Sequence, residues 1–420
     1  MEYGLIGNPL KHSFSKEVHS YLSNYNYELC ELSEQSFDSF MLKKNFKALN
    51  VTIPYKKKVI PYLDYVDENA KNIGAVNTII NKNSKLYGYN TDILGVISTF
   101  KHFDIDINNK NVLILGTGAT SNTVYHAVSK LNAHKIYKAY RLQSKIKGDI
   151  LYDDILNIAD DIHIIVNTTS NGMYPHQDDK SLINIIDFKK LEAVMDVVYN
   201  PLRTMLLINA QNNGIKAVSG LYMLVAQAVY ANKLFLGNDI DSIKGNDIIN
   251  QISDIYSKSY IDKLNIVLIG MPSCGKTKLG GMIATKYKYN FIDIDKLIEN
   301  KINCPISEYI KKFGEKSFRD VEEETIKEIS TKNHCVIATG GGAILRENNI
   351  YNLKYNGKLF FINRSLNLLK PTNDRPLTSN RNDLEKIYND RLPLYKKYCD
   401  VEINGDAEFD SKINDIISQI

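Results

Sequence analysis

The stretch Gly270-Met-Pro-Ser-Cys-Gly-Lys-Thr277 decides the fold of the second half of the chain. It follows the apolar run 265–269 and precedes a helix-compatible segment, residues 278–288. Strand, glycine-rich loop and helix in this order predict a phosphate-binding P-loop, because glycines let backbone N–H groups surround a phosphate at the positive end of a helix. We expect the loop to bind ATP through Gly270, Ser273, Cys274, Gly275, Lys276 and Thr277, with Lys276 on the β- and γ-phosphates and Thr277 on Mg²⁺.

The composition is that of a globular protein with more than one domain. A chain of 420 residues suits two or three domains, and 44% hydrophobic residues allow a large core. The net charge of +4 comes from 52 basic and 48 acidic residues, so no overall field calls for nucleic acid as a partner.

The cysteines and the apolar runs bear on the cellular location. Five scattered cysteines with no C-x-x-C pair argue against a disulfide framework and a zinc site, and they fit a reducing compartment. No apolar run approaches the roughly twenty residues of a membrane-spanning helix. We expect a cytoplasmic protein with no membrane partner, and the sequence leaves its oligomeric state open.

Four polar motifs mark the first 95 residues. They are Ser13-x-Ser15, Asn50-Val-Thr52-x-Pro-x-Lys56, Ala75-Val-Asn77-Thr78 and Asn90-Thr-Asp92. Each has a plain structural interpretation, because Ser15 and Asp92 can cap the helices that follow them and a lysine is usually solvated. The two serines at a loop-to-helix junction can equally bind a polyhydroxylated ligand.

In this order and spacing the motifs resemble the shikimate dehydrogenase family, and the resemblance extends to about residue 257. It implies that the shikimate hydroxyls and carboxylate are held by Ser13, Ser15, Thr52, Asn77 and Asp92. It also implies that Lys56 and Asp92 form the catalytic pair. Hydride delivery to a ketone leaves an alkoxide, and a lysine beside a carboxylate supplies the proton that the alkoxide needs. Lys16 stands where the family often has proline, and we expect little effect beyond the helix start.

A dinucleotide-binding turn is indicated by the strand 111–115 and the glycines that follow it. Gly116-Thr-Gly118-Ala119 lacks the third glycine of the motif, so taken alone it is weak. After the next strand, Arg141 and Lys145 stand where an NAD site places an acidic residue, which favours NADP over NAD. A solvated loop arginine is the alternative for Arg141. The family usually shows Asn-Arg-Thr here, and Tyr140 and Leu142 replace the outer two residues.

The later loops of the first half complete the expected cleft. The resemblance places the segments 167–173 and 199–204 beside the nicotinamide, with Tyr199 near the substrate and Gln227 in contact with it. The residues expected to hold NADP(H) are Gly116, Gly118, Ala119, Arg141, Lys145, Thr168 and Gly220.

In the second half, acidic and basic residues follow the P-loop at regular intervals. Asp293 and Asp295 end the strand that begins at 289, and residues two apart point the same way in an extended strand. Arg319 and Glu322 are three apart on a helix, so they can pair, either in a site or as an ordinary surface pair. Three glycines, 340–342, at a strand end suggest close approach of a ligand to the backbone.

Together with Arg375-Pro-Leu and Arg391-x-x-x-Tyr395, these motifs resemble the shikimate kinase family over residues 264–404. The resemblance implies that shikimate binds to Asp295, Arg319, Arg391 and the backbone of Gly340, Gly341 and Gly342, with both arginines on its carboxylate. Glu322 then orients Arg319, Asp293 supports Mg²⁺ through water with Thr277, and Asp295 orients or deprotonates the attacking hydroxyl. Lys276 and Arg375 stabilise the transferred charge, Arg375 from a closing lid. Lys370-Pro371 stands where the family commonly has a lid arginine.

The expected fold is α/β throughout. We expect a two-domain shikimate dehydrogenase-like unit, with residues 1–95 and 220–257 forming the shikimate-binding α/β domain and 96–219 a Rossmann NADP domain. A linker, 258–263, then leads to a kinase domain of the P-loop nucleoside-monophosphate-kinase type, 264–420. This organisation indicates reduction of 3-dehydroshikimate followed by phosphorylation of shikimate, with NADP(H), ATP and Mg²⁺. A quinate dehydrogenase using NAD and a catalytically silent ligand-binding regulator remain as alternatives.

Overall fold

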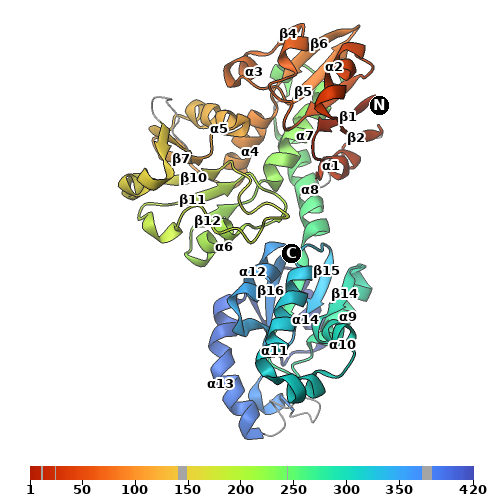
Figure 1. Ribbon diagram of the computed structural model, residues 1–420, viewed down its shortest axis with the longest axis vertical. Helices are drawn as coiled ribbons and strands as arrows, with labels where there is room; N and C mark the ends of the chain where they lie inside the picture. The colour runs from red at the N-terminus through yellow and green to blue at the C-terminus, as the bar shows by residue number, and fades with distance from the viewer. Residues whose placement is uncertain (11–12, 24, 141–148, 244, 371–380) are drawn as a thin grey trace. The chain divides into compact units, whose positions relative to one another are not determined.

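The computed structural model describes residues 1–10, 13–23, 25–140, 149–243, 245–370 and 381–420. Within these residues the chain forms two compact units, Met1–Tyr260 and Ile261–Ile420 (Figure 1). The first unit contains two six-stranded sheets and the second unit one five-stranded sheet, all with helices packed against them. The α/β class expected from the sequence is thereby confirmed.

The first sheet is mixed and has the strand order β2-β1-β3-β5-β6-β4. Its strands are β1 (Tyr3–Gly7), β2 (Tyr27–Glu31), β3 (Ala48–Val51), β4 (Tyr65–Val66), β5 (Thr78–Lys82) and β6 (Lys85–Tyr89). β1 pairs in parallel with β2 and β3, whereas β5 runs antiparallel to β3 and β6. The helices of this region are α1 (Ser15–Ser20), α2 (Glu34–Lys43) and α3 (Glu68–Ile73).

The second sheet is fully parallel and has the order β12-β11-β10-β7-β8-β9. Its strands are β7 (Asn111–Leu115), β8 (Lys135–Tyr140), β9 (Asp149–Leu151), β10 (Ile164–Asn167), β11 (Ala193–Asp196) and β12 (Lys216–Val218). Its helices are α5 (Ala119–Lys130) and α6 (Met205–Asn212). The strand order reverses between β7 and β10, and ligands of open parallel sheets bind outside the carboxyl ends of the strands at such a point.

Helices α4 (Asp92–His102) and α7 (Leu221–Phe235) pack against each other between the two sheets (Figure 1). Val96 and Phe100 of α4 belong to the core of the second sheet, whereas Val225 and Val229 of α7 belong to the core of the first. The boundary that we expected at 95/96 falls inside helix α4.

The third sheet is parallel, with the order β14-β15-β13-β16-β17. Its strands are β13 (Asn265–Ile269), β14 (Asn290–Asp293), β15 (Cys335–Ala338), β16 (Gly357–Asn363) and β17 (Val401–Asn404). Its helices are α9 (Lys276–Tyr287), α10 (Ile294–Ile302), α11 (Ile306–Ile329), α12 (Glu347–Tyr355), α13 (Arg381–Tyr398) and α14 (Phe409–Ile417). The central strands β13 and β15 are buried along their whole length, which explains their unbroken apolar sequences.

One expectation about local structure was wrong, and one helix is kinked. Residues 258–263, expected to be a linker, are the last part of helix α8 (Asn246–Lys263), and only Leu264 separates this helix from β13. Helix α11 is kinked at Gly314, which has a φ of 84° and a ψ of 161°. Glycine tolerates this φ because it lacks a β-carbon.

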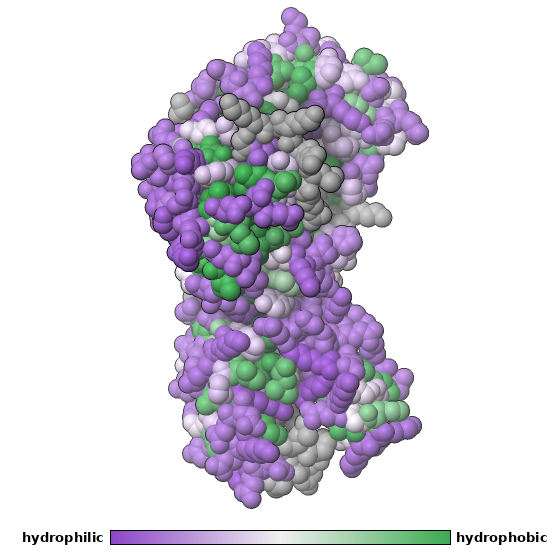
Figure 2. Space-filling view, turned by 60° about the vertical axis from the view of Figure 1, so that its left-hand side comes forward, coloured by the Kyte–Doolittle hydropathy of each residue, from purple (hydrophilic) through white to green (hydrophobic). Residues whose placement is uncertain are grey.

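The surface drawn in Figure 2 is covered largely by hydrophilic residues, with smaller apolar areas on both units. Among the residues that the structure describes, no helix is both long enough and apolar enough to cross a membrane. Short 3₁₀ helices fill several connections: η1 (Ile60–Tyr62), η2 (Tyr152–Asn157), η3 (Ala159–Asp161), η4 (Ile185–Asp187), η5 (Ile240–Ser242), η6 (Ala343–Leu345) and η7 (Leu366–Leu368).

Candidate active sites

A lysine–aspartate ion pair lies at the centre of the first candidate site. Lys56 Nζ lies 2.6 Å from Asp92 Oδ2, and 15% and 9% of the two side chains are exposed. Lys56 follows β3, and Asp92 is the first residue of α4, so the pair joins elements 36 residues apart. The sequence also allowed a solvated lysine and a helix cap, and both interpretations are wrong: Lys56 is largely buried, and Asp92 pairs with Lys56.

The Asn77 side chain connects the ion pair to neighbouring elements through hydrogen bonds. Its Nδ2 donates to Asp92 Oδ1 at 2.8 Å and to Gln227 Oε1 at 3.4 Å, and its Oδ1 accepts from the Thr91 backbone N–H at 2.7 Å. Thr91 was absent from our set of expected ligands, although it stands inside the Asn90-Thr91-Asp92 motif. A threonine between two site residues is the signal that could have identified it.

Ser13, Ser15 and Tyr199 form a second group. Ser13 Oγ donates to Ser15 Oγ at 3.1 Å and accepts from the Ser15 backbone N–H at 3.3 Å. Burial raises the pKa of Tyr199, and its hydrogen bond with Ser13 partly offsets this rise. Ser15 is the first residue of α1, whose N-cap is Phe14, so the interpretation of Ser15 as a cap is wrong. Thr52 lies in the turn after β3, and its backbone N–H donates to Ile6 O.

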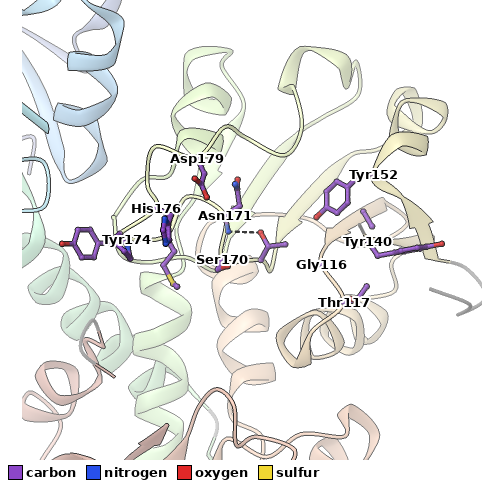
Figure 3. A pocket seen from close by; sticks show the side chains of 13 residues that line it. Gly116, Thr117, Tyr140, Tyr152, Ser170, Asn171, Tyr174, His176 and Asp179 are labelled. Atoms are coloured by element: carbon purple, nitrogen blue, oxygen red, sulfur yellow. Dashed lines mark hydrogen bonds between the residues drawn. The ribbon is translucent and has the colours of Figure 1, made fainter. Parts of the chain in front are cut away.

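A cavity of about 440 Å³ opens where the strand order of the second sheet reverses (Figure 3). Gly116 and Thr117 from the turn after β7 form one wall, with Tyr140 at the end of β8 beside them. The loop after β10 forms the opposite wall with Ser170 and Asn171. A dinucleotide fits this place, because Gly116, at a φ of 105°, leaves a close approach open at the start of α5.

Of the predicted cofactor residues that the structure describes, Gly116 is the one that lines this cavity. Thr168 Oγ1 donates to Leu115 O at 2.7 Å, and Gly118 and Ala119 begin helix α5. Gly220 precedes α7 and lies so close to the loop after β11 that a β-carbon would stand 2.1 Å from Val197 O. Arg141 and Lys145 lie outside the described residues. Tyr152, His176 and Asp179 also line the cavity, and no sequence motif marks them.

The phosphate loop of the second unit encloses the Lys276 ammonium. Lys276 Nζ donates to Gly270 O at 2.8 Å and to Met271 O at 2.9 Å, and it lies 3.7 Å from Cys274 Sγ. Positive φ values at Gly270, Ser273 and Gly275 curl the backbone around this point. Such a loop, at the start of α9, presents N–H groups to an anion.

The two acids after the loop differ in local structure. Asp293 ends β14 and caps α10 by accepting from the Lys296 backbone N–H at 3.2 Å, and it also accepts from Thr277 Oγ1 at 2.7 Å. Asp295 lies in the first turn of α10, so the expectation that both acids extend one strand was wrong. The oxygens of Thr277 and Asp293 are adjacent, and oxygen ligands suit Mg²⁺.

Arg319 is held by two acidic residues of its own helix. Its Nη1 donates to Glu322 Oε2 at 2.8 Å and its Nη2 to Glu315 Oε1 at 2.9 Å. Burial raises the pKa of Glu322, and the charge of Arg319 partly offsets this rise. Since 10% of the Arg319 side chain and 0% of that of Glu322 are exposed, the alternative of an ordinary surface pair is wrong.

The three glycines after β15 lie among these groups. A β-carbon on Gly340 would stand 2.6 Å from Asp295 Oδ1, and one on Gly342 would stand 2.2 Å from Arg319 Nη2. Arg391 Nη1 donates to Gly341 O at 3.0 Å. The structure therefore gathers Asp295, Arg319 and Arg391 around the glycine segment. Arg375 lies outside the described residues.

Fold and sites define the class first: a Rossmann-type oxidoreductase unit followed by a P-loop kinase-type unit. Residues 5–79 match the shikimate dehydrogenase substrate binding domain, and residues 272–420 match shikimate kinase. Shikimate dehydrogenase (NADP(+)) of Methanococcus maripaludis is 36% identical over 253 residues, which are 56% of this chain and 91% of the relative. The corresponding enzyme of Caldanaerobacter subterraneus is also 36% identical, over 57% of this chain and 92% of the relative. The chain belongs to the shikimate dehydrogenase family, and its C-terminal region carries a shikimate kinase domain.

Solved structures agree with the assignment of the dehydrogenase part of the chain. Shikimate dehydrogenase 1 from Peptoclostridium difficile aligns with a TM-score of 0.55 and 31% identity, over 62% of this chain and 98% of that one. A chorismate mutase/shikimate 5-dehydrogenase fusion protein from Clostridium acetobutylicum gives a TM-score of 0.55 and 33% identity, over 61% and 96% of the two chains. The expected family resemblance is confirmed for both halves.

Proposed function

We propose that this chain catalyses two consecutive reactions in the cytoplasm: NADPH-dependent reduction of 3-dehydroshikimate to shikimate, and MgATP-dependent phosphorylation of shikimate to shikimate 3-phosphate. Residues 1–95 and 220–257 would bind the first substrate, 96–219 NADP(H), and 264–420 would carry the kinase. The ion pair of Lys56 and Asp92, at 2.6 Å, carries the first assignment. The matching kinase region with its phosphate loop supports the second.

In the dehydrogenase, NADPH supplies the hydride when it is bound. Lys56 would donate a proton to the alkoxide oxygen as it forms, and Asp92 would hold the ammonium and receive a substrate hydroxyl. Asn77 keeps Asp92 in place through its 2.8 Å hydrogen bond, so that the pair does not reorganise during the reaction. Thr52, Gln227 and the group of Ser13, Ser15 and Tyr199 would bind the remaining hydroxyls and the carboxylate.

In the kinase, MgATP supplies the phosphoryl group. Lys276 would leave its two carbonyl partners for the β- and γ-phosphates, and Thr277 and Asp293 would hold Mg²⁺, partly through water. Asp295 would orient or deprotonate the attacking hydroxyl, while Arg319 and Arg391 would bind the carboxylate. We assign charge stabilisation from the lid to Arg375.

A coupled assay tests the proposal. The purified chain receives 3-dehydroshikimate, NADPH and MgATP, and NADPH loss and ADP formation are followed separately. Equal consumption of both is the expected result. NADPH loss without ADP would overturn the kinase assignment, and ADP formation only on added shikimate would overturn the dehydrogenase assignment. Comparing NADP⁺ with NAD⁺ on shikimate and quinate separates the proposal from a quinate dehydrogenase.

A further inference from the structure

Gly341 lies between the phosphate loop and helix α13. On one side, a β-carbon on Gly341 would stand 2.6 Å from Pro272 Cδ and 3.0 Å from Pro272 N, so its backbone packs directly on the phosphate loop. On the other side, its carbonyl accepts from Tyr395 Oη at 2.5 Å and from Arg391 Nη1 at 3.0 Å. The same peptide therefore touches the nucleotide loop and the helix that carries a proposed shikimate ligand.

Tyr395 is held rigidly. Its side chain is fully buried, and its ring stacks on Phe361 of β16 with centroids 4.9 Å apart and an interplanar angle of 9°. Arg391 precedes Tyr395 by four residues on α13, so both side chains lie on one face of the helix. Burial raises the pKa of Tyr395, which keeps its hydroxyl a neutral donor at ordinary pH.

The two donors to the Gly341 carbonyl, Arg391 and Tyr395, differ in whether they are proposed to bind the substrate. Arg391 is needed by the shikimate carboxylate, so a bound substrate competes with Gly341 O for its guanidinium. The Tyr395 hydroxyl donates to the Gly341 carbonyl and also hydrogen-bonds with Arg391, so it contacts both the peptide and the guanidinium.

We propose that Tyr395 is a positioning residue that fixes Gly341 between the shikimate site and the phosphate loop, so that binding of both kinase substrates depends on its hydroxyl. The inference rests on the proposed kinase function for shikimate. Its nucleotide part rests on the contact of Gly341 with Pro272.

Tyr395→Phe tests this role, because it removes the hydroxyl and keeps the ring that stacks on Phe361. Losing one hydrogen bond to a carbonyl corresponds to about a fivefold to tenfold effect. We expect the KM values for shikimate and for MgATP each to rise by roughly this factor, with a smaller change in kcat. Tyr398→Phe, three residues further along α13, is the matched control and should keep both KM values within about twofold of wild type.

A binding measurement separates failure of this inference from failure of the proposed function. Calorimetric titration with MgADP needs no catalysis, and we expect Tyr395→Phe, but not Tyr398→Phe, to weaken the Kd by the same factor. Unchanged nucleotide affinity would overturn the inference whether or not the wild-type chain phosphorylates shikimate. A rise in the shikimate KM alone would also overturn it, as would effects that vanish on cooling because the variant is merely less stable.

Discussion

The two candidate sites differ in the partners of the lysines proposed to act in them. Lys56 of the dehydrogenase unit pairs with a carboxylate, Asp92, that is itself expected to take part in the reaction. Lys276 of the kinase unit is held by the neutral carbonyls of Gly270 and Met271, which belong to its own loop. The charge of Lys56 is balanced by Asp92 before a ligand binds. Among the residues that the structure describes, Lys276 has no acidic partner, so its ammonium can pair with a phosphate.

This difference follows from the chemistry proposed for each unit. Proton donation to an alkoxide requires a lysine whose position is fixed relative to an acid, so a preformed pair is suitable. Binding of a highly charged phosphate requires a cation that can exchange weak partners for a strong one. The same residue type therefore needs an ionic partner in one site and replaceable partners in the other.

The largest expected effect is loss of each activity on replacing its lysine. Lys56→Ala should lower dehydrogenase kcat by about a thousandfold or more and leave the kinase unchanged, and Lys276→Met should do the reverse. NADPH oxidation and ADP release from the same preparations measure both. If either variant kept its own activity, the role assigned to that lysine would be wrong.

The second largest expected effect is a difference in how the stability of each unit changes as the pH falls. Burial lowers the pKa of His19 from 6.5 to about 3, so the stability that the uncharged form contributes is present above pH 6.5 and lost as the pH falls. Between pH 6.5 and pH 4 the loss amounts to about 3 kcal/mol. In the kinase unit, Glu322 has a pKa raised above 4.5, so its contribution is present at low pH and lost as the pH rises. Hydrogen–deuterium exchange of peptides from each unit between pH 7 and 4 measures both trends.

His19→Gln supplies the control for this prediction. The variant should remove most of the acid sensitivity of the first unit and leave the second unit unchanged. Equal acid sensitivity of the first unit in the variant and the wild type would show that other groups control it.

Substitution of the two lysines should also lower the free energy of unfolding by different amounts. Lys56→Met leaves the carboxylate of Asp92 buried without its partner, which should cost the first unit about 3 kcal/mol. Lys276→Met leaves two carbonyls and should cost the second unit about 1 kcal/mol. Chemical denaturation followed by exchange of unit-specific peptides measures each loss. Lys56→Met combined with Asp92→Asn should recover stability without activity, and failure to recover would deny that the unpaired charge is the cause.

The smallest expected effect concerns the partners of Arg319. Glu322→Gln should raise the KM for shikimate about tenfold, because a buried charged acceptor of the guanidinium is lost. Glu315→Gln, whose side chain is 42% exposed, should change the KM less than threefold. Steady-state kinetics at fixed MgATP measure both. Equal effects of the two substitutions would show that burial does not decide which acid orients Arg319.

The sequence predicted the parts of this molecule that local pattern controls. The strand–loop–helix around Gly270–Thr277 and the buried strands 111–115 and 335–338 agree with the structure because apolar runs and glycines act over a few residues. The pairing of Lys56 with Asp92 rested on family resemblance, because spacing alone cannot bring together residues 36 positions apart.

Other features depended on tertiary context. Asp295 lies in the first turn of a helix because Asp293 caps α10, and two alternating acids in a sequence do not decide between strand and helix. Residues 258–263 are polar and looked like a linker, yet they continue a helix whose buried face carries Ile252, Ile255 and Ser259. Tyr152, the first residue of the 3₁₀ helix η2, lines the cavity together with Gly116, and no sequence motif predicts this helix.

The crowded glycine segment 340–342 also limits how the kinase gene can change. Any single-base change that alters a glycine codon yields either a stop or a residue with a β-carbon. At these three codons that carbon would strike Asp295, Pro272 or Arg319. For an inhibitor that binds to this backbone, a resistance mutation at any of the three glycines would therefore also damage the enzyme.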